Sequence, residues 1–452
     1  MMKIKVTRLK IIVAFLKKNI LLILLGLFIG FLAYQLTPNL IKKWQQHQQK
    51  NRVIGMVGNY TLFSLPSEVE NLISLGLTSL TPEGEATAGA ALKWEVKNQG
   101  KTYLFTLNTQ LKWHDGKFLE AQDIDYQITG VEKTIVSPNQ IQFDLEEPFA
   151  PFPVSLAKPL FRKKTLGLGE YKIKSIETRL GDIISQIKLV STSKNYNQEL
   201  TFNFYPTEEM LKNAFLLGEV KEAWGLNNVE EFKKWPNIKI TPQQKSNERY
   251  IALFFNTKKS PFDDKRFRQA LAYMTEKPLK ETRALSPISP FSWAYNKNVK
   301  TYDFNPIHAN KILEEAGINS SGTEITLVTP ADLLTLADKI KKNWEGSGIK
   351  VKVLVESLDI QKEDFDVILG YGIIPPDPDQ YYFWHSGQPG NITNYENPRI
   401  DKLLEEGRKT MVKEKRKEIY YDFQRFLVED SPAIFLAYPE IYNIFREPII
   451  KF

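Results

Sequence analysis

The sequence contains no cysteine and little histidine. None of its 452 residues is cysteine, and only four are histidine. The lack of thiols excludes disulfides, thiolate nucleophiles, zinc or iron–sulfur sites with cysteine ligands, and lipid attachment through an N-terminal cysteine. The sequence also lacks a Gly-x-Ser-x-Gly elbow and any paired-histidine motif, so no nucleophile or metal-ligand set has a recognisable spacing. We therefore expect a protein that is not an enzyme and that carries no cofactor.

Two pairs of residues could be mistaken for catalytic or metal-binding pairs. His114 and Asp115 are adjacent, so they do not face one another on a strand or helix, and the following Gly116 marks a tight turn. Asp377 and Asp379 stand in a proline-rich loop, where aspartates usually serve the turn itself. We interpret both pairs as structural with respect to catalysis.

Positive charge is concentrated at one end of the chain. The formal net charge is +7, but nine of the 60 Lys and Arg residues lie in residues 1–50, which hold no Asp or Glu. The remaining 51 basic residues nearly balance the 53 acidic ones. The body of the protein therefore offers no basic surface for phosphates, and we expect no nucleic-acid partner.

The N-terminal residues are predicted to anchor the chain in a membrane. Basic residues precede the uncharged run 20–36, which is about long enough to span a bilayer. The charge excess predicts a cytoplasmic N-terminus at 1–18, a single transmembrane signal anchor at 19–36 and a tether at 37–51. A cleaved signal peptide is the alternative, although no clear small-x-small cleavage site follows the run. The body is then expected outside the cytoplasmic membrane.

The composition of the chain is that of a globular protein, and its apolar pattern predicts alternating strands and helices. The chain is 42% hydrophobic and 12% aromatic, and its length suffices for two or three domains. Just past the middle, the apolar run 250–255 predicts a strand buried on both faces, and apolar residues from Phe267 to Met274 recur at helical spacing. Strand 325–329, helix 333–344 and a further strand then predict a βαβ unit.

The exact residues of several segments are more specific than this pattern of strands and helices. The segments FFNTKKSPFDDKRFRQALAYM, LKWHDGKFLEAQDIDYQI, NPRIDKLLEEGR and EIYYDFQRFLVEDSPAIFL resemble the family 5 extracellular solute-binding proteins, the oligopeptide and dipeptide receptors of ABC importers. The resemblance covers roughly residues 52–440. It implies an α/β, two-lobed, periplasmic-binding-protein-like fold of type II, the large peptide-binding type with an extra subdomain.

The resemblance also implies domain boundaries. Lobe I would comprise residues 52–72, 167–250 and 438–452, and residues 73–166 would form a subdomain upon it. Lobe II would comprise residues 251–437. The function implied is an extracytoplasmic receptor that delivers a solute, with a short peptide favoured, to the permease subunits of an ABC transporter. We expect a monomer. The alternative is a surface sensor or scaffold that keeps the fold and has lost peptide binding.

The aromatic-dense loop 371–384 is the leading candidate for a wall of the binding cleft. Aromatic side chains supply contact area with little sequence discrimination, which suits a receptor for varied peptides. Trp293 is a weaker candidate. The predicted ligand-binding residues are Tyr371, Gly372, Ile374, Asp377, Asp379, Tyr381, Trp384 and Trp293.

One position of this loop departs from the family. Peptide-binding members carry a Trp-x-Ala-Asp-Tyr-Pro-Asp-Pro pattern, whose first Asp pairs with the α-amino group of the ligand. In this chain the corresponding residues, 371–378, are YGIIPPDP, and Ile374 occupies the position of that Asp. A buried ammonium facing isoleucine would lose its charge-assisted partner.

Three possibilities follow from this replacement. The ligand has no free amine at this place, or Asp377 or Asp379 reaches in, or the pocket no longer binds peptides. We predict that free-amine and N-acetylated peptides bind about equally, with contacts dominated by Tyr371, Tyr381 and Trp384.

Overall fold

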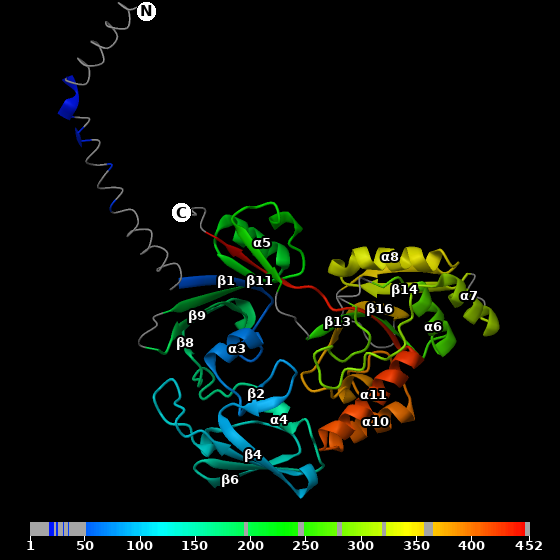
Figure 1. Ribbon diagram of the computed structural model, residues 1–452, viewed down its shortest axis with the longest axis horizontal. Helices are drawn as coiled ribbons and strands as arrows, with labels where there is room; N and C mark the ends of the chain where they lie inside the picture. Colours follow the sequence, from blue (N-terminus) through cyan, green and yellow to red (C-terminus); the bar gives the residue numbers. More distant parts are fainter. Residues whose placement is uncertain are drawn as a thin grey trace, which may run out of the picture.

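The protein consists of two lobes and a smaller sheet domain, as the computed structural model of the 452-residue chain shows (Figure 1). Apart from a few positions between 18 and 35, the structure describes residues 51–193, 198–242, 248–277, 283–318, 322–356 and 365–447. Most of the predicted transmembrane anchor, residues 19–36, lies outside the described residues. In the described part of the chain, no helix is both long enough and apolar enough to cross a bilayer.

The first lobe is built on a seven-stranded mixed sheet. Its strands, in spatial order, are β12 (Ile238–Pro242), β18 (Tyr442–Arg446), β11 (Glu222–Leu226), β1 (Asn51–Val57), β10 (Glu199–Tyr205), β9 (Ile184–Ser191) and β8 (Tyr171–Thr178). The central strand β1 runs parallel to both β10 and β11. Helix α5 (Glu208–Leu217) connects β10 to β11; Thr207 caps its start, and Gly218, with φ of 82°, ends it. Helix α3 (Ser67–Ile73) buries Val69 and Ile73 against this lobe.

The subdomain is an antiparallel sheet with a hydrophobic core of its own. The strand order is β4 (Ala91–Lys97), β5 (Thr102–Leu107), β7 (Gln140–Leu145) and β6 (Val131–Ser137). Strands β2 (Thr78–Leu80) and β3 (Ala86–Ala88) form a separate hairpin, and the short helix α4 (Phe152–Ser155) covers the core. Alternating residues of β5 and β7 point inward, as a half-buried sheet requires, and these buried rings include Tyr103, Phe105 and Phe143.

His114 and Asp115 join the subdomain to a neighbouring loop. The backbone N–H of Gly167 donates to His114 Nδ1 at 3.2 Å, so Nε2 carries the hydrogen that is donated to the carbonyl of Gly169 at 3.1 Å. Burial lowers the pKa of His114. Asp115 forms an ion pair with Arg162. Both side chains therefore hold loops together, which is the role that the structural interpretation gives them.

The second lobe has a five-stranded sheet covered by helices. Its strand order is β15 (Lys350–Val355), β14 (Glu324–Thr329), β16 (Val367–Ile373), β13 (Arg249–Phe255) and β17 (Ala433–Ala437). The helices are α6 (Lys265–Met274), α7 (Pro306–Glu315), α8 (Leu334–Glu345), α9 (Tyr381–Trp384), α10 (Pro398–Lys409) and α11 (Lys413–Asp430). Strand β13 is the predicted apolar run, and six of its seven residues are buried.

The chain passes between the lobes more than once. It leaves the first sheet after β12 and enters the second at β13, and after β17 it returns to the first sheet as β18. Figure 1 shows this C-terminal strand (red) running from the second lobe into the sheet of the first. Because β13 begins at Arg249, the second sheet starts two residues before the expected boundary at 251.

Candidate functional site

The carboxyl ends of parallel strands from both lobes lie near one another. In the first lobe β1, β10 and β11 are parallel, and in the second β14 is parallel to β15 and to β16. Ligands of open α/β sheets bind in the crevice outside the carboxyl ends of the strands. We therefore take the segments that follow these strands as the candidate site.

A chain of polar contacts connects the two carboxyl edges. Arg249, the first residue of β13, lies over the ring of Tyr371 with 4.5 Å between its guanidinium carbon and the ring centroid. Its Nη2 donates to Asn227 Oδ1 at 3.0 Å, and Asn227 donates in turn to Glu208 at the start of α5. The Tyr371 hydroxyl donates to Asp332 Oδ2 at 2.6 Å. We call these five residues the inter-lobe network.

Carboxylates predominate around this network. Burial, together with the Asp332 carboxylate that accepts its hydrogen bond, raises the pKa of Tyr371, so the hydroxyl remains a donor. Partial burial and then the nearby Glu68 carboxylate raise the pKa of Glu248. Glu68 belongs to α3 of the first lobe, whereas Glu248 precedes β13. Acidic groups from both lobes thus lie near the guanidinium of Arg249, and one of them, Glu208, is also paired with Lys212 at 3.2 Å.

Ile374 lies inward from this face. Its side chain is 6% exposed and belongs to the hydrophobic core of the second lobe. Its backbone N–H donates to the carbonyl of Glu248 at 2.7 Å, which ties the loop to the crossing segment. Gly372 is required beside it, because a Cβ at this position would overlap the ring of Tyr250. The Ile374 side chain itself offers no acceptor to an ammonium group.

Asp377 is engaged in a buried ion pair. It is 6% exposed and receives hydrogen bonds from Arg416 Nη2 at 2.7 Å and Nη1 at 3.1 Å. The remaining donors of Arg416 reach the carbonyl of Gly407 and the hydroxyl of Tyr420. A two-fold contact between guanidinium and carboxylate fixes both partners. Asp377 is therefore a structural element of the loop.

Asp379 is held by a second arginine. Arg408 Nε lies 3.1 Å from Asp379 Oδ2, at ion-pair distance but without the alignment of a hydrogen bond. The other carboxylate oxygen accepts the backbone N–H of Tyr381 at 3.1 Å. Burial raises the pKa of Asp379. Arg408 stacks on the ring of Tyr381 and also on the ring of Phe149, which belongs to the subdomain. Both aspartates of the loop thus already have cationic partners.

The predicted aromatic wall is divided between different surroundings. Trp384 is 2% exposed and packs between Phe254 and Phe435, at 6.5 and 6.0 Å between ring centroids, so its ring belongs to the core. Trp293 packs on Tyr420, beside the buried ion pair. Of the eight predicted residues, Tyr371 alone takes part in the inter-lobe network. The other four network residues were not predicted. Arg249 begins a strand, and the other three lie just after a strand or at the start of a helix.

The subdomain contacts the second lobe beside this loop. Gly84, at the tip of the β2–β3 hairpin, lies so close to Pro376 that a Cβ would overlap its carbonyl oxygen. Glu85 forms an ion pair with Lys413, at the start of α11. The backbone N–H of Ala150 donates to the carbonyl of Arg408 at 2.7 Å. The second lobe therefore touches the rest of the protein at the inter-lobe network and again at this contact.

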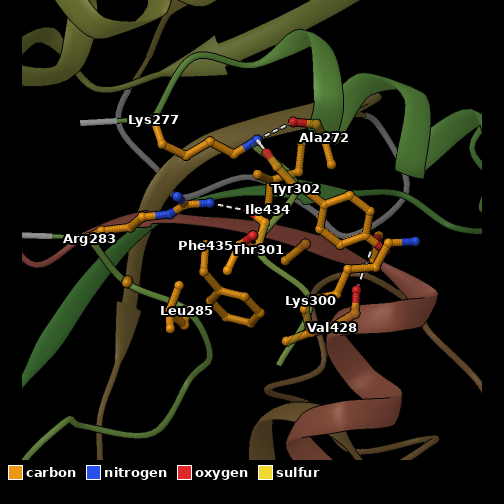
Figure 2. A pocket seen from close by; sticks show the side chains of 13 residues that line it. Ala272, Lys277, Arg283, Leu285, Lys300, Thr301, Tyr302, Val428, Ile434 and Phe435 are labelled. Atoms are coloured by element: carbon orange, nitrogen blue, oxygen red, sulfur yellow. Dashed lines mark hydrogen bonds between the residues drawn. The ribbon is translucent and has the colours of Figure 1, made fainter. Parts of the chain in front are cut away.

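Three cavities lie away from the predicted residues. A groove of about 850 Å³ lies on the subdomain, and a hollow of about 270 Å³ adjoins His114. A hollow of about 20 Å³, enough for one water molecule, lies beside Lys277 in the second lobe (Figure 2). None of the eight predicted ligand-binding residues lines these cavities.

The fold and the facing strand ends define a two-lobed α/β binding protein. Residues 85–394 match the family described as bacterial extracellular solute-binding proteins, family 5 Middle. The chain belongs to this family, which confirms the resemblance drawn from its motifs.

Individual relatives are distant but cover most of the chain. It is 22% identical to the dipeptide-binding protein of Escherichia coli strain K12 over 448 residues, which span 81% of this chain and 83% of that protein. It is also 22% identical to the oligopeptide-binding protein AppA of Bacillus subtilis strain 168, over 86% of each chain.

Solved structures share the fold. NikZ of Campylobacter jejuni in complex with Ni(L-His) superposes with a TM-score of 0.74 at 22% identity, covering 88% of this chain and 94% of that one. AppA of Bacillus subtilis in complex with a nonapeptide superposes with a TM-score of 0.69 at 20% identity, covering 89% and 96%. Both likenesses show that this chain shares their fold.

Proposed function

We propose that this protein is a membrane-anchored extracytoplasmic receptor, monomeric, that binds a short peptide between its lobes and delivers it to an ABC importer. The observation that carries the proposal is the inter-lobe network, where the carboxyl edges of two α/β sheets are joined through Arg249. Contacts that close across two lobes convert ligand binding into a change of shape that a membrane partner can recognise. Relatives named for dipeptides and for a nonapeptide complex support a peptide as the solute.

The loop chemistry supports a peptide whose α-amino group is not the main anchor. Ile374 provides no charge, and the two aspartates of the loop are paired with Arg416 and Arg408. The route in which Asp377 or Asp379 serves the amine would require breaking an ion pair, and for Asp377 that pair is buried and two-fold. Acidic groups outside the loop, Glu248 above all, are the remaining partners for a cation.

The test is calorimetry with matched peptides on the full-length protein. Each peptide of a short library is titrated with a free and with an acetylated N-terminus, and we expect the two affinities to agree within about threefold. Tyr371→Ala should weaken binding of both forms, since it removes the ring and the hydroxyl of the network. Tyr382→Ala, an exposed ring on α9, is the matched control and should bind as the wild type does.

Acetylation that weakens binding by about 2 kcal/mol or more would show that another carboxylate serves the amine. In that case Glu248→Gln identifies it, because the neutral variant should then lose the preference for the free amine.

A second candidate is a surface sensor or scaffold that has kept the fold without peptide binding. The observation that favours it is the absence of a free carboxylate in the loop at residues 371–384. Flat titrations with a folded protein across the library would support this candidate against import.

A further inference from the structure

The small hollow in the second lobe is bordered by positive charge. Its volume of about 20 Å³ admits one particle of the size of a water molecule (Figure 2). Three charged side chains line it, those of Lys277, Arg283 and Lys300, and all three are cationic. Lys277 follows α6, and Lys300 precedes α7. No residue of the inter-lobe network lines this hollow.

Among the described residues, two donors beside the hollow have no acceptor. Lys277 Nζ donates to two backbone carbonyls, so the third N–H of a charged ammonium is left over. The Nε atom of Arg283 is buried and has no hydrogen-bond partner. The terminal nitrogens of the same guanidinium are used, because Nη1 donates to Asp303 and Nη2 donates to the carbonyl of Thr301. A buried N–H without a partner calls for a bound water or ion.

The nearby acid does not balance these charges. Asp303 lies 2.8 Å from Arg283 Nη1, but its side chain is 77% exposed. Lys300 places its ammonium over the ring of Tyr302, and no ion pair of Lys300 is formed within the described ranges. Figure 2 shows the side chains of Lys277 and Arg283 extending alongside each other. Burial and then this neighbouring guanidinium lower the pKa of Lys277, as expected for two cations that repel.

The occupant that fits this hollow is small and negative. A water molecule could accept both hydrogen bonds, but it would leave the positive charge unbalanced. Carboxylate, sulfate and phosphate groups contain several heavy atoms and exceed the space of one water molecule. A chloride ion is only slightly larger than water and accepts hydrogen bonds from several directions. Apolar side chains, among them Leu285, Val428 and Phe435, also line the hollow and strengthen the attraction between opposite charges.

We propose that this hollow binds one small inorganic anion, chloride or another halide, between the ammonium of Lys277 and Nε of Arg283, as a site separate from the inter-lobe network. Lys277 follows α6, whereas Arg283 forms a β-bridge with Ala437 at the end of β17. The bound ion therefore joins two segments of the second lobe and stabilises their contact. Strand β17 is the last strand of this lobe before the chain returns to the first sheet.

The experiment uses the full-length protein with sodium chloride as the probe. Exchange of chloride with a protein site broadens the chloride NMR signal of the solution, and the excess width measures the bound ion. The measurement is made at about pH 6, below the pKa of about 7 of Lys277, so that the ammonium is present. We expect Lys277→Met and Arg283→Met each to weaken chloride binding about tenfold or more. Lys339→Met, at an exposed ion pair on α8, is the matched control and should keep the wild-type width.

A second measurement on the wild type guards against a variant that fails to fold. In a crystal soaked in sodium bromide, we expect an anomalous peak within hydrogen-bond distance of Lys277 Nζ and Arg283 Nε. A bromide peak without chloride broadening in solution would mean an adventitious ion only, and the proposal would be wrong. Broadening that persists in both hollow variants would place the ion elsewhere and overturn it as well.

One further variant tests whether the chain supplies its own anion. Residues 278–282 connect the two cations and contain a single acid, Glu281. If Glu281→Gln binds chloride and the wild type does not, a carboxylate of the protein takes the place of the ion and the proposal fails. Equal broadening in the wild type and in Glu281→Gln supports the halide site. None of these outcomes depends on whether peptides bind at the inter-lobe network.

Discussion

Lys277 predicts an unusual dependence of stability on pH. It follows α6 in the second lobe, and its Nζ donates to the carbonyls of Ala272 and Tyr302 beside the small hollow (Figure 2). Two acceptors match the two N–H bonds of a neutral amine, whereas an ammonium has three. Burial, and then the nearby Arg283 guanidinium, lower the pKa of Lys277 to about 7, although Asp303 opposes the shift.

The direction of this pH dependence follows from the linkage between proton binding and folding. Between about pH 7 and the usual lysine pKa near 10.5, the unfolded chain holds a proton that the folded chain has released. Unfolding therefore becomes less favourable as pH rises through this window. At about 1.4 kcal/mol per unit the full shift corresponds to roughly 5 kcal/mol, and because the hollow adjoins water we expect about half of that.

The assay is urea denaturation at a series of pH values, for the wild type and for Lys277→Met. The variant cannot titrate at this position, so the difference in unfolding free energy between the two proteins isolates Lys277. We expect this difference to shift by about 2 kcal/mol in favour of the wild type between pH 7 and about pH 9.5. Lys300→Met, an exposed lysine at the same hollow, is the control and should show no such shift. A difference that stays constant with pH for Lys277→Met would refute the reasoning.

Two further predictions concern the junction between the loop and the subdomain. Arg416→Met should lower the unfolding free energy by about 3–5 kcal/mol, because it leaves the buried carboxylate of Asp377 without its partner. Lys413→Met, at an exposed ion pair, is the control and should lower the unfolding free energy by less than about 1 kcal/mol. Similar losses in the two variants would mean that water reaches the buried pair. Gly84→Ala and Gly116→Ala impose the same backbone strain, at φ of 82° and 86°, but only the first Cβ meets an occupied space. We expect urea denaturation to show a cost of about 1 kcal/mol for Gly116→Ala and a clearly larger one for Gly84→Ala, and equal costs would show that the hairpin does not press on the second lobe.

Much of the fold could be predicted because its signals are local. The apolar run at 250–255 became β13, since a strand buried on both faces needs apolar residues at every position. Asn305 caps α7 with its side chain on the N–H of His308, as the Asn-Pro pair indicates. Periodicity and caps act within a few residues, so the sequence displays them directly.

The candidate site was predicted less completely because its contacts are remote in sequence. In the sequence Asp377 is an acidic residue of a loop with no visible partner, because its partner Arg416 lies 39 residues further along. Trp384 reads as an aromatic of the cleft wall, but α9 places it between Phe254 and Phe435. The role of Arg249 could not be predicted, because its partners Asn227 and Tyr371 come from both lobes and are close to it only in the folded protein.

The sequence by itself determined what chemistry is unavailable to this protein and to which family it belongs. The absence of cysteine, the nearly neutral body and the replacement of an acid by Ile374 can be read without coordinates, because they depend only on which residues are present and in what order. Only the tertiary structure decided which charged groups remain free to meet a solute. Burial and ion pairing depend on the three-dimensional neighbours of a side chain, and here those neighbours come from helices and strands far away in the chain.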